Sequence, residues 1–289
     1  MTVQARARCM FEAIDWYRPW LAPFLPVLRE TIGLLANGEH RSDVSLDHWR
    51  DDFNAAAGRC AIENHRTLPL QFVDQAALPA GTAYEAFISD TGHVPTRRNL
   101  HDFFNALVWL AYPLAKAQLN ALQAAELIRR QADDASPVGP GGRSTRGVVR
   151  DRATIFDENA AILVSADPAI ESALQAHCWQ DALVSRRAAF GVSCEVRLFG
   201  HALIEKLVAP YKAITAHVWV LRVNADYFSL PTRERSALVD CMLRERLKDG
   251  LLDTAPTPLP VLGVPGWWGT QDAAFYADAS VFRLRRAHA

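Results

Sequence analysis

A short polar segment inside an apolar stretch is the first place where this sequence could carry chemistry. Residues 99–105 read Asn-Leu-His-Asp-Phe-Phe-Asn, so His101 and Asn105 share one face of a helix, with Asp102 beside it. The neighbouring phenylalanines predict burial, and buried polar groups need partners. A His101–Asp102 pair could ligate a metal ion or transfer a proton. Alternatively, these residues only cap the start of the helix.

Two further segments supply histidine and carboxylate groups. Asp157 and Glu158 lie in a predicted β-hairpin over 154–165, where adjacent carboxylates on a turn could bind one divalent metal ion. The alternative is an ordinary polar turn. His201 follows Gly200 at a predicted strand-to-helix break, a position where ligands bind in open sheets, although it could also cap the helix.

Three other residues are candidates for binding a substrate, together with Asn105. Arg97 and Lys206 could hold an anionic group through their charge. Trp267, which precedes Trp268 in a Gly-x-Pro-Gly-Trp segment, could form the wall of a ligand cleft. A tail that packs these aromatic rings over the core is the alternative.

The elements that would position these residues differ between the two halves of the chain. Apolar spacing and proline positions predict helices at 8–37, 45–57, 100–110, 113–130, 168–177, 201–208 and 231–247, and extended segments at 68–73, 84–88, 194–199 and 214–223. We therefore expect an α+β (mixed α/β) fold, with a helical N-terminal half packed on a small mixed sheet from the C-terminal half. We expect a single compact unit over 1–289, in which subdomains 1–132 and 148–289 would be joined by the Gly/Pro/Ser-rich loop 133–147.

Composition limits the classes of function. The 289 residues include 31 Lys and Arg against 32 Asp and Glu, a formal net charge of -1, which argues against bulk nucleic-acid binding. The five scattered cysteines form no Cys-x-x-Cys pair, as expected for free thiols in a reducing cytoplasm. The charged N-terminus does not fit a signal peptide, and the sequence contains no apolar run that predicts a membrane span. We therefore expect a cytoplasmic protein that does not bind membranes.

Several of these segments together resemble a bacterial family of unknown function. They are the block from Pro95-Thr96-Arg97 through His101-Asp102-Phe103-Phe104-Asn105 to Lys116 and Asn120, then Phe156-Asp157-Glu158-Asn159, Leu198-Phe199-Gly200-His201, and the Gly-x-Pro-Gly-Trp segment. The sequence is similar to domain of unknown function 3025 from about residue 69 to 283. The resemblance implies that the family's recurring polar residues fall at Arg97, His101, Asp102, Asn105, Asp157, Glu158, His201 and Lys206.

Two hypotheses of function follow from these residues. In the first, the protein is a metal-assisted or acid–base hydrolase of a small anionic substrate, such as a phosphoester. His101, Asp102 and His201 would be catalytic, with Asp157 and Glu158 holding a divalent metal ion. In the second, the protein is a non-catalytic binding or scaffold protein whose polar residues form a structural network.

Overall fold

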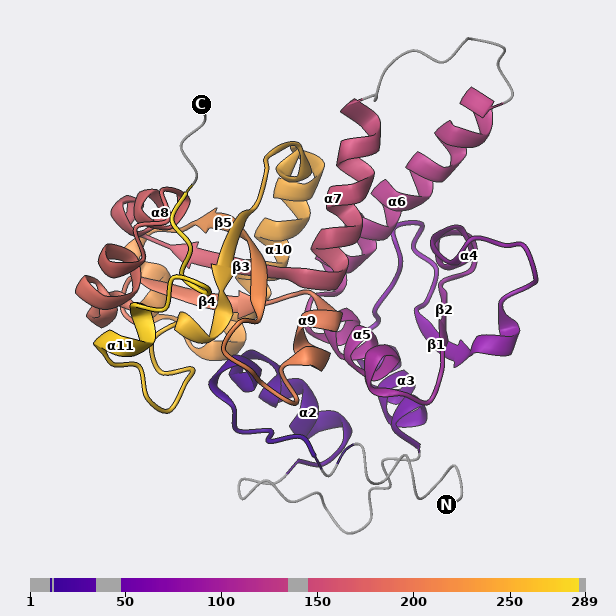
Figure 1. Cartoon of the computed structure of the whole chain (residues 1–289). Helices are drawn as coiled ribbons and strands as arrows, with labels where there is room; N and C mark the ends of the chain where they lie inside the picture. The colour runs from indigo at the N-terminus through magenta and orange to yellow at the C-terminus, as the bar shows by residue number, and fades with distance from the viewer. Residues whose placement is uncertain (1–10, 12, 35–47, 135–144, 286–289) are drawn as a thin grey trace.

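The chain folds as helices around two small sheets, in the computed structural model that describes residues 11, 13–34, 48–134 and 145–285 (Figure 1). The helices are η1 (Pro19–Phe24), α2 (Leu25–Thr31), α3 (Trp49–Arg59), η3 (Gln75–Ala77), α4 (Tyr84–Thr91), α5 (Leu100–Ala111), α6 (Pro113–Asp134), α7 (Thr145–Asn159), α8 (Pro168–Gln175), η4 (Gln180–Ser185), η5 (Arg187–Ala189), α9 (His201–Lys206), η6 (Ala225–Ser229), α10 (Thr232–Lys248), η7 (Leu251–Asp253), η8 (Val261–Gly263) and α11 (Ala273–Tyr276). The strands are β1 (Gln71–Asp74), β2 (His93–Thr96), β3 (Ala160–Ser165), β4 (Cys194–Leu198), β5 (Thr215–Arg222) and β6 (Thr257–Pro260). This architecture confirms the predicted α+β class.

The larger sheet has the strand order β4-β3-β5-β6. Strand β3 pairs antiparallel with β4 and parallel with β5, in a register that puts Ala161 opposite both Leu198 and Val218. Every residue of β3 is buried, as expected for a central strand covered on both faces. Strands β1 and β2 form a separate parallel pair, on the opposite side of α5 in Figure 1.

Helices α5 and α6 lie where the sequence pattern predicts them. Asn99 caps α5, since its Oδ1 accepts the backbone N–H of Asp102 at 2.8 Å, and Pro113 begins α6. Asp167 caps α8 in the same way. The buried side chains of both halves of the chain form one hydrophobic cluster, in which Phe103 contacts the rings of Phe11, Trp16, Trp49, Phe53 and Phe104.

The hairpin predicted over 154–165 is wrong in its first strand and its turn, whereas its second strand is confirmed as β3. Residues up to Asn159 continue α7, and β3 follows directly at Ala160. The β-branched residues Thr154 and Ile155 favour a strand locally, but Ala153 and Phe156 are both buried, three residues apart, on one face of the helix. Asp157 and Glu158 therefore lie in the last turn of a helix and not at a hairpin tip.

The extended segment predicted at 84–88 is also wrong, because Tyr84–Thr91 is α4. Gly92 ends this helix in the left-handed region, with φ at 75°, where glycine has no side-chain penalty. Of the predicted linker 133–147, residues 135–144 lie outside the described residues, and the flanking positions belong to α6 and α7. Within the described ranges, no helix combines the length and apolar character needed to cross a membrane.

Helix α6 begins on a carboxylate that a distant helix supplies. Asp240 of α10 is buried, and its two oxygens accept the backbone N–H groups of Ala115 at 2.8 Å and Leu114 at 3.1 Å. These are N–H groups that a helix cannot satisfy internally. The contact therefore joins the start of α6 to the face of α10.

We expect Asp240→Ala to lower the free energy of unfolding by about 1–3 kcal/mol, because two N–H groups lose their acceptor inside the protein. Asp240→Asn keeps one acceptor oxygen and is expected to lose less. Urea denaturation at pH 7 measures both values. Equal losses for the two variants would show that the capping contact is not the source of the effect.

Candidate metal and acid–base site

Three helix ends meet at the centre of the molecule and carry the candidate site. His101 lies in the first turn of α5, His201 is the first residue of α9, and Glu158 is in the last turn of α7. Figure 1 shows these three helices meeting between the larger sheet and the β1–β2 pair. Helix α9 contacts both α5 and α7. Residues far apart in the sequence are thus brought to one place.

Gly200 explains why α9 begins so close to the end of α7. Its backbone N–H donates to the carbonyl of Ala160 at 2.9 Å, at the junction between α7 and β3. A Cβ at this position would lie 2.4 Å from the backbone nitrogens of Asn159 and Ala160. Only glycine allows this approach, which sets His201 beside Asp157 and Glu158.

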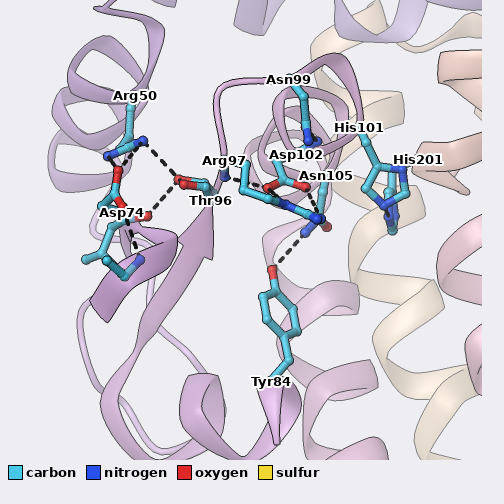
Figure 2. A network of polar contacts seen from close by, with 12 residues as sticks. Arg50, Asp74, Tyr84, Thr96, Arg97, Asn99, His101, Asp102, Asn105 and His201 are labelled. Atoms are coloured by element: carbon cyan, nitrogen blue, oxygen red, sulfur yellow. Dashed lines mark hydrogen bonds and ion pairs between the residues drawn. The ribbon is translucent and has the colours of Figure 1, made fainter. Parts of the chain in front are cut away.

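The two histidine rings face each other through their Nε2 atoms. Figure 2 shows His101 and His201 side by side, and the two Nε2 atoms are 3.0 Å apart. The ring centroids are 4.5 Å apart with an interplanar angle of 73°. Since each nitrogen can donate or accept, one proton lies between the two rings, and a cation could replace it.

Glu158 completes a set of three donor groups. Its Oε2 is 3.6 Å from Nε2 of His201, and one ligand atom from each of His101, Glu158 and His201 lies within 4.8 Å of the other two. The His201 side chain is only 5% exposed, whereas Glu158 is 41% exposed. The set therefore has a buried side and a side that is open to solvent.

Glu205 fixes which nitrogen of His101 faces the cluster. The Oε2 atom of Glu205 is 2.9 Å from Nδ1 of His101. A carboxylate can only accept, so the proton of His101 is on Nδ1 and the lone pair of Nε2 points at His201. Histidines that bind metal ions in proteins commonly have a carboxylate in this position.

A second carboxylate lies behind His201 and is held by a buried lysine. Oδ1 of Asp157 is 4.0 Å from Nδ1 of His201. The same oxygen accepts a short hydrogen bond from Nζ of Lys116, which also donates to Oδ1 of Asn105 at 2.9 Å. Nδ2 of Asn105 in turn donates to the hydroxyl of Tyr84 at 3.1 Å, as Figure 2 shows. The site thus continues into a buried hydrogen-bonded network.

The pKa values of these groups are shifted by burial and by neighbouring charges. Burial is the main reason that the pKa of His201 is lowered to about 4, so its ring is neutral at pH 7. Burial, followed by the charge of Asp157, raises the pKa of Glu158 above its usual value. The same two causes raise the pKa of Glu85 to about 7. For Asp157, burial acts upward, but the Lys116 ammonium and His201 outweigh it and the pKa is lowered.

Arg97 and Asp102 are paired with each other beside the histidines. Nε of Arg97 donates to Oδ2 of Asp102 at 3.0 Å, and the backbone N–H of Arg97 donates to the same oxygen. Figure 2 shows the Asp102 carboxylate directed at Arg97. The carboxylate that contacts Nδ1 of His101 belongs to Glu205. Asp102 is buried, whereas the Arg97 side chain is 60% exposed.

The remaining predicted site residues lie at different distances from this cluster. Asn105 joins it through Lys116. Lys206 is exposed at the end of α9, and its charge lowers the pKa of the nearby His217, although burial is the larger cause. Trp267 is buried in the hydrophobic core, where its ring centroid is 5.8 Å from that of Trp20. None of the described contacts of the cluster involves Trp267.

Two residues of the cluster were not among the predicted site residues. Glu205 follows His201 by four positions, so one helix face presents both, and this spacing was a signal for the pair. Lys116 lies on the apolar side of α6, one turn before Leu119 and Asn120, both of which are buried. A lysine at a buried helix position needs a carboxylate partner, which is a second signal.

Comparison with known proteins assigns a family but no activity. No curated protein and no solved structure matches the chain significantly. One family model matches residues 70–286, which is most of the chain and includes His101, Glu158 and His201. The chain therefore belongs to the family described as "Protein of unknown function (DUF3025)".

Proposed function

We propose that the protein binds one divalent transition-metal ion through Nε2 of His101, Nε2 of His201 and the carboxylate of Glu158. We propose further that it is a metal-assisted hydrolase of a small anionic substrate. The observation that carries the proposal is the convergence of these three donor groups, with ligand atoms within 4.8 Å of one another. The two imidazoles and one carboxylate come from three different helices.

The donor set indicates the kind of metal ion. Imidazole suits zinc, iron, copper and nickel better than the hard cations magnesium and calcium, which prefer oxygen ligands. Three protein ligands leave at least one coordination position free for water or substrate, as in catalytic zinc sites. The solvent-exposed side of Glu158 and His101 agrees with such an open position.

Each residue has a distinct role in this proposal. A bound metal ion supplies a Lewis acid that lowers the pKa of a coordinated water to about 7. Glu205 keeps the His101 proton on Nδ1, so that Nε2 stays free to bind. Arg97, in the loop before α5, and Lys206, at the end of α9, are exposed cations on the elements that carry the histidines, and their charge favours an anionic substrate.

The test of this proposal is a titration of the purified, chelator-treated protein with Co²⁺. We expect one equivalent to bind and to produce visible absorption bands of a cobalt site with histidine ligands. His48→Ala is a matched control, because His48 is an exposed histidine that pairs with Asp51 at the surface. Wild-type protein that binds no Co²⁺, Zn²⁺ or Mn²⁺ would contradict the proposal.

Hydrolysis is tested separately from binding. The metal-loaded protein is expected to cleave p-nitrophenyl phosphate or bis(p-nitrophenyl) phosphate faster than the chelated protein does. If the protein binds the metal ion but hydrolyses no anionic ester, the metal site is supported and the proposed hydrolase activity is contradicted. Absence of both would favour the scaffold hypothesis, in which the Lys116–Asp157 network is purely structural.

A further inference from the structure

Lys116 is the most completely enclosed charged group next to the candidate metal site. The residue is 4% exposed, and its ammonium contacts Asp157, Asn105 and the face of the Trp109 ring, with Nζ 5.3 Å from the ring centroid. Burying a lysine and a carboxylate together is costly unless both are fully hydrogen-bonded. Apolar side chains of similar volume often give a protein of equal or greater stability, so a buried pair of this kind points to a role other than stability.

The position of Asp157 relative to His201 suggests that reason. His101 offers a lone pair at Nε2, so His201 donates the proton between the two rings from its own Nε2. Nδ1 of His201 is buried without a hydrogen bond of good geometry, and it lies on the side of the ring where Asp157 presents its backbone carbonyl. Oδ1 of the Asp157 carboxylate is 4.0 Å from this Nδ1.

A cation at Nε2 changes the proton on this ring. His201 can coordinate through Nε2 only if its proton moves to Nδ1, and the Nδ1–H then needs an acceptor on the buried side. Asp157 is on that side with both its backbone carbonyl and its carboxylate, and the hydrogen bond from Lys116 holds that carboxylate in place. Glu205 does the same for His101 without the help of a lysine, since it is partly exposed to water.

We infer that Lys116 is a positioning residue of the metal site, which acts through Asp157 to hold the tautomer and orientation of His201 that bind the ion. The inference rests on the proposed metal site and adds the residue that sets its affinity from the buried side. Loss of such an outer partner typically weakens metal binding about 10- to 100-fold.

Four proteins test this chain of contacts: the wild type, Lys116→Met, Asp157→Asn and the double variant. Each is titrated with Co²⁺, and both the dissociation constant and the visible spectrum are recorded. We expect each single variant to bind about 10- to 100-fold more weakly, with shifted cobalt bands. If Lys116 acts through Asp157, the double variant binds Co²⁺ no more weakly than Asp157→Asn. In Asp157→Asn the carboxylate that Lys116 holds is already gone, so removing Lys116 as well has no further effect.

Lys212→Met is the matched control. Lys212 also pairs with a carboxylate, that of Asp278 at 2.7 Å, and lies over an aromatic ring, that of Phe275 at 4.6 Å. This variant removes the same chemistry elsewhere in the protein and is expected to bind Co²⁺ with the wild-type dissociation constant and spectrum.

The outcomes separate this inference from the proposal on which it rests. A wild type that does not bind Co²⁺ refutes the metal site itself. A wild type that binds, with Lys116→Met unchanged in affinity and spectrum or with losses that multiply in the double variant, overturns the role of Lys116. Lys116→Met could fail to fold, which circular dichroism would show. The Co²⁺ dissociation constants of Asp157→Asn and of the double variant then test the role of Lys116, because the double variant buries neither charge. Equal affinities support the inference, and a further tenfold loss overturns it.

Discussion

His201→Ala is expected to weaken the binding of Co²⁺ by about 70- to 900-fold. Structural zinc sites with four ligands bind with about 10–16 kcal/mol, so that one ligand accounts for about 2.5–4 kcal/mol. His201 is the buried member of the set, with 5% of its side chain exposed, so water cannot readily replace it. Calorimetric titration of the chelator-treated variant measures the loss, and any metal-dependent hydrolysis should fall with it.

One control variant and one second ligand variant make this result specific. His48→Ala removes an exposed histidine and is expected to leave binding unchanged. Glu158→Gln keeps the size of the third donor but removes its charge, and we expect a smaller loss than for His201→Ala. If His201→Ala binds Co²⁺ as tightly as the wild type while folding normally, His201 is not a ligand, and the proposed site has to be abandoned.

Gly200→Ala is expected to have the largest effect on stability, a loss of more than about 3 kcal/mol, the upper end of the usual cost of overpacking. The added methyl group would lie 2.4 Å from two backbone nitrogens, those of Asn159 and Ala160. Backbone atoms cannot rotate away as a flexible side chain can, so α9 would have to move away from the end of α7. The midpoint and slope of urea denaturation measure the change.

Gly58→Ala is the matched control for this variant. Gly58 lies in the last turn of α3, and a Cβ added there would meet nothing within 4 Å. Since alanine favours a helix over glycine by up to about 1 kcal/mol, this variant should be at least as stable as the wild type. A Gly200→Ala protein as stable as Gly58→Ala would mean that the junction is not as tight as the backbone distances indicate.

The amino-acid pattern predicted much of the fold because most of its signals are local. Asn99 before α5, Pro113 at the start of α6 and Asp167 before α8 mark helix starts through short-range hydrogen bonds. Residues 84–88 and 154–156 were predicted as strands but are helical, and both are short runs in which β-branched or aromatic residues favour a strand. In both segments, side chains on one helix face are buried against residues distant in the sequence, and this packing outweighs the local preference for a strand.

The candidate site was only partly predictable, for a related reason. His101, Glu158 and His201 could be named from residue type and from nearby turn signals. Their convergence depends on the packing of α9 against α5 and α7, which involves contacts between residues about a hundred positions apart. Trp267 shows the opposite case, since a pair of adjacent tryptophans indicates either a cleft or a core, and here Trp267 is buried against Trp20.

The ligand geometry also has a mechanical consequence. His101 comes before residues 135–144, and Glu158 and His201 come after them, so an ion held by all three would tie the two parts of the chain together as a removable cross-link. An ion that binds only the folded chain adds about 2.7 kcal/mol to its stability at a hundred times its dissociation constant. The resistance of the protein to unfolding would then rise and fall with the concentration of the ion.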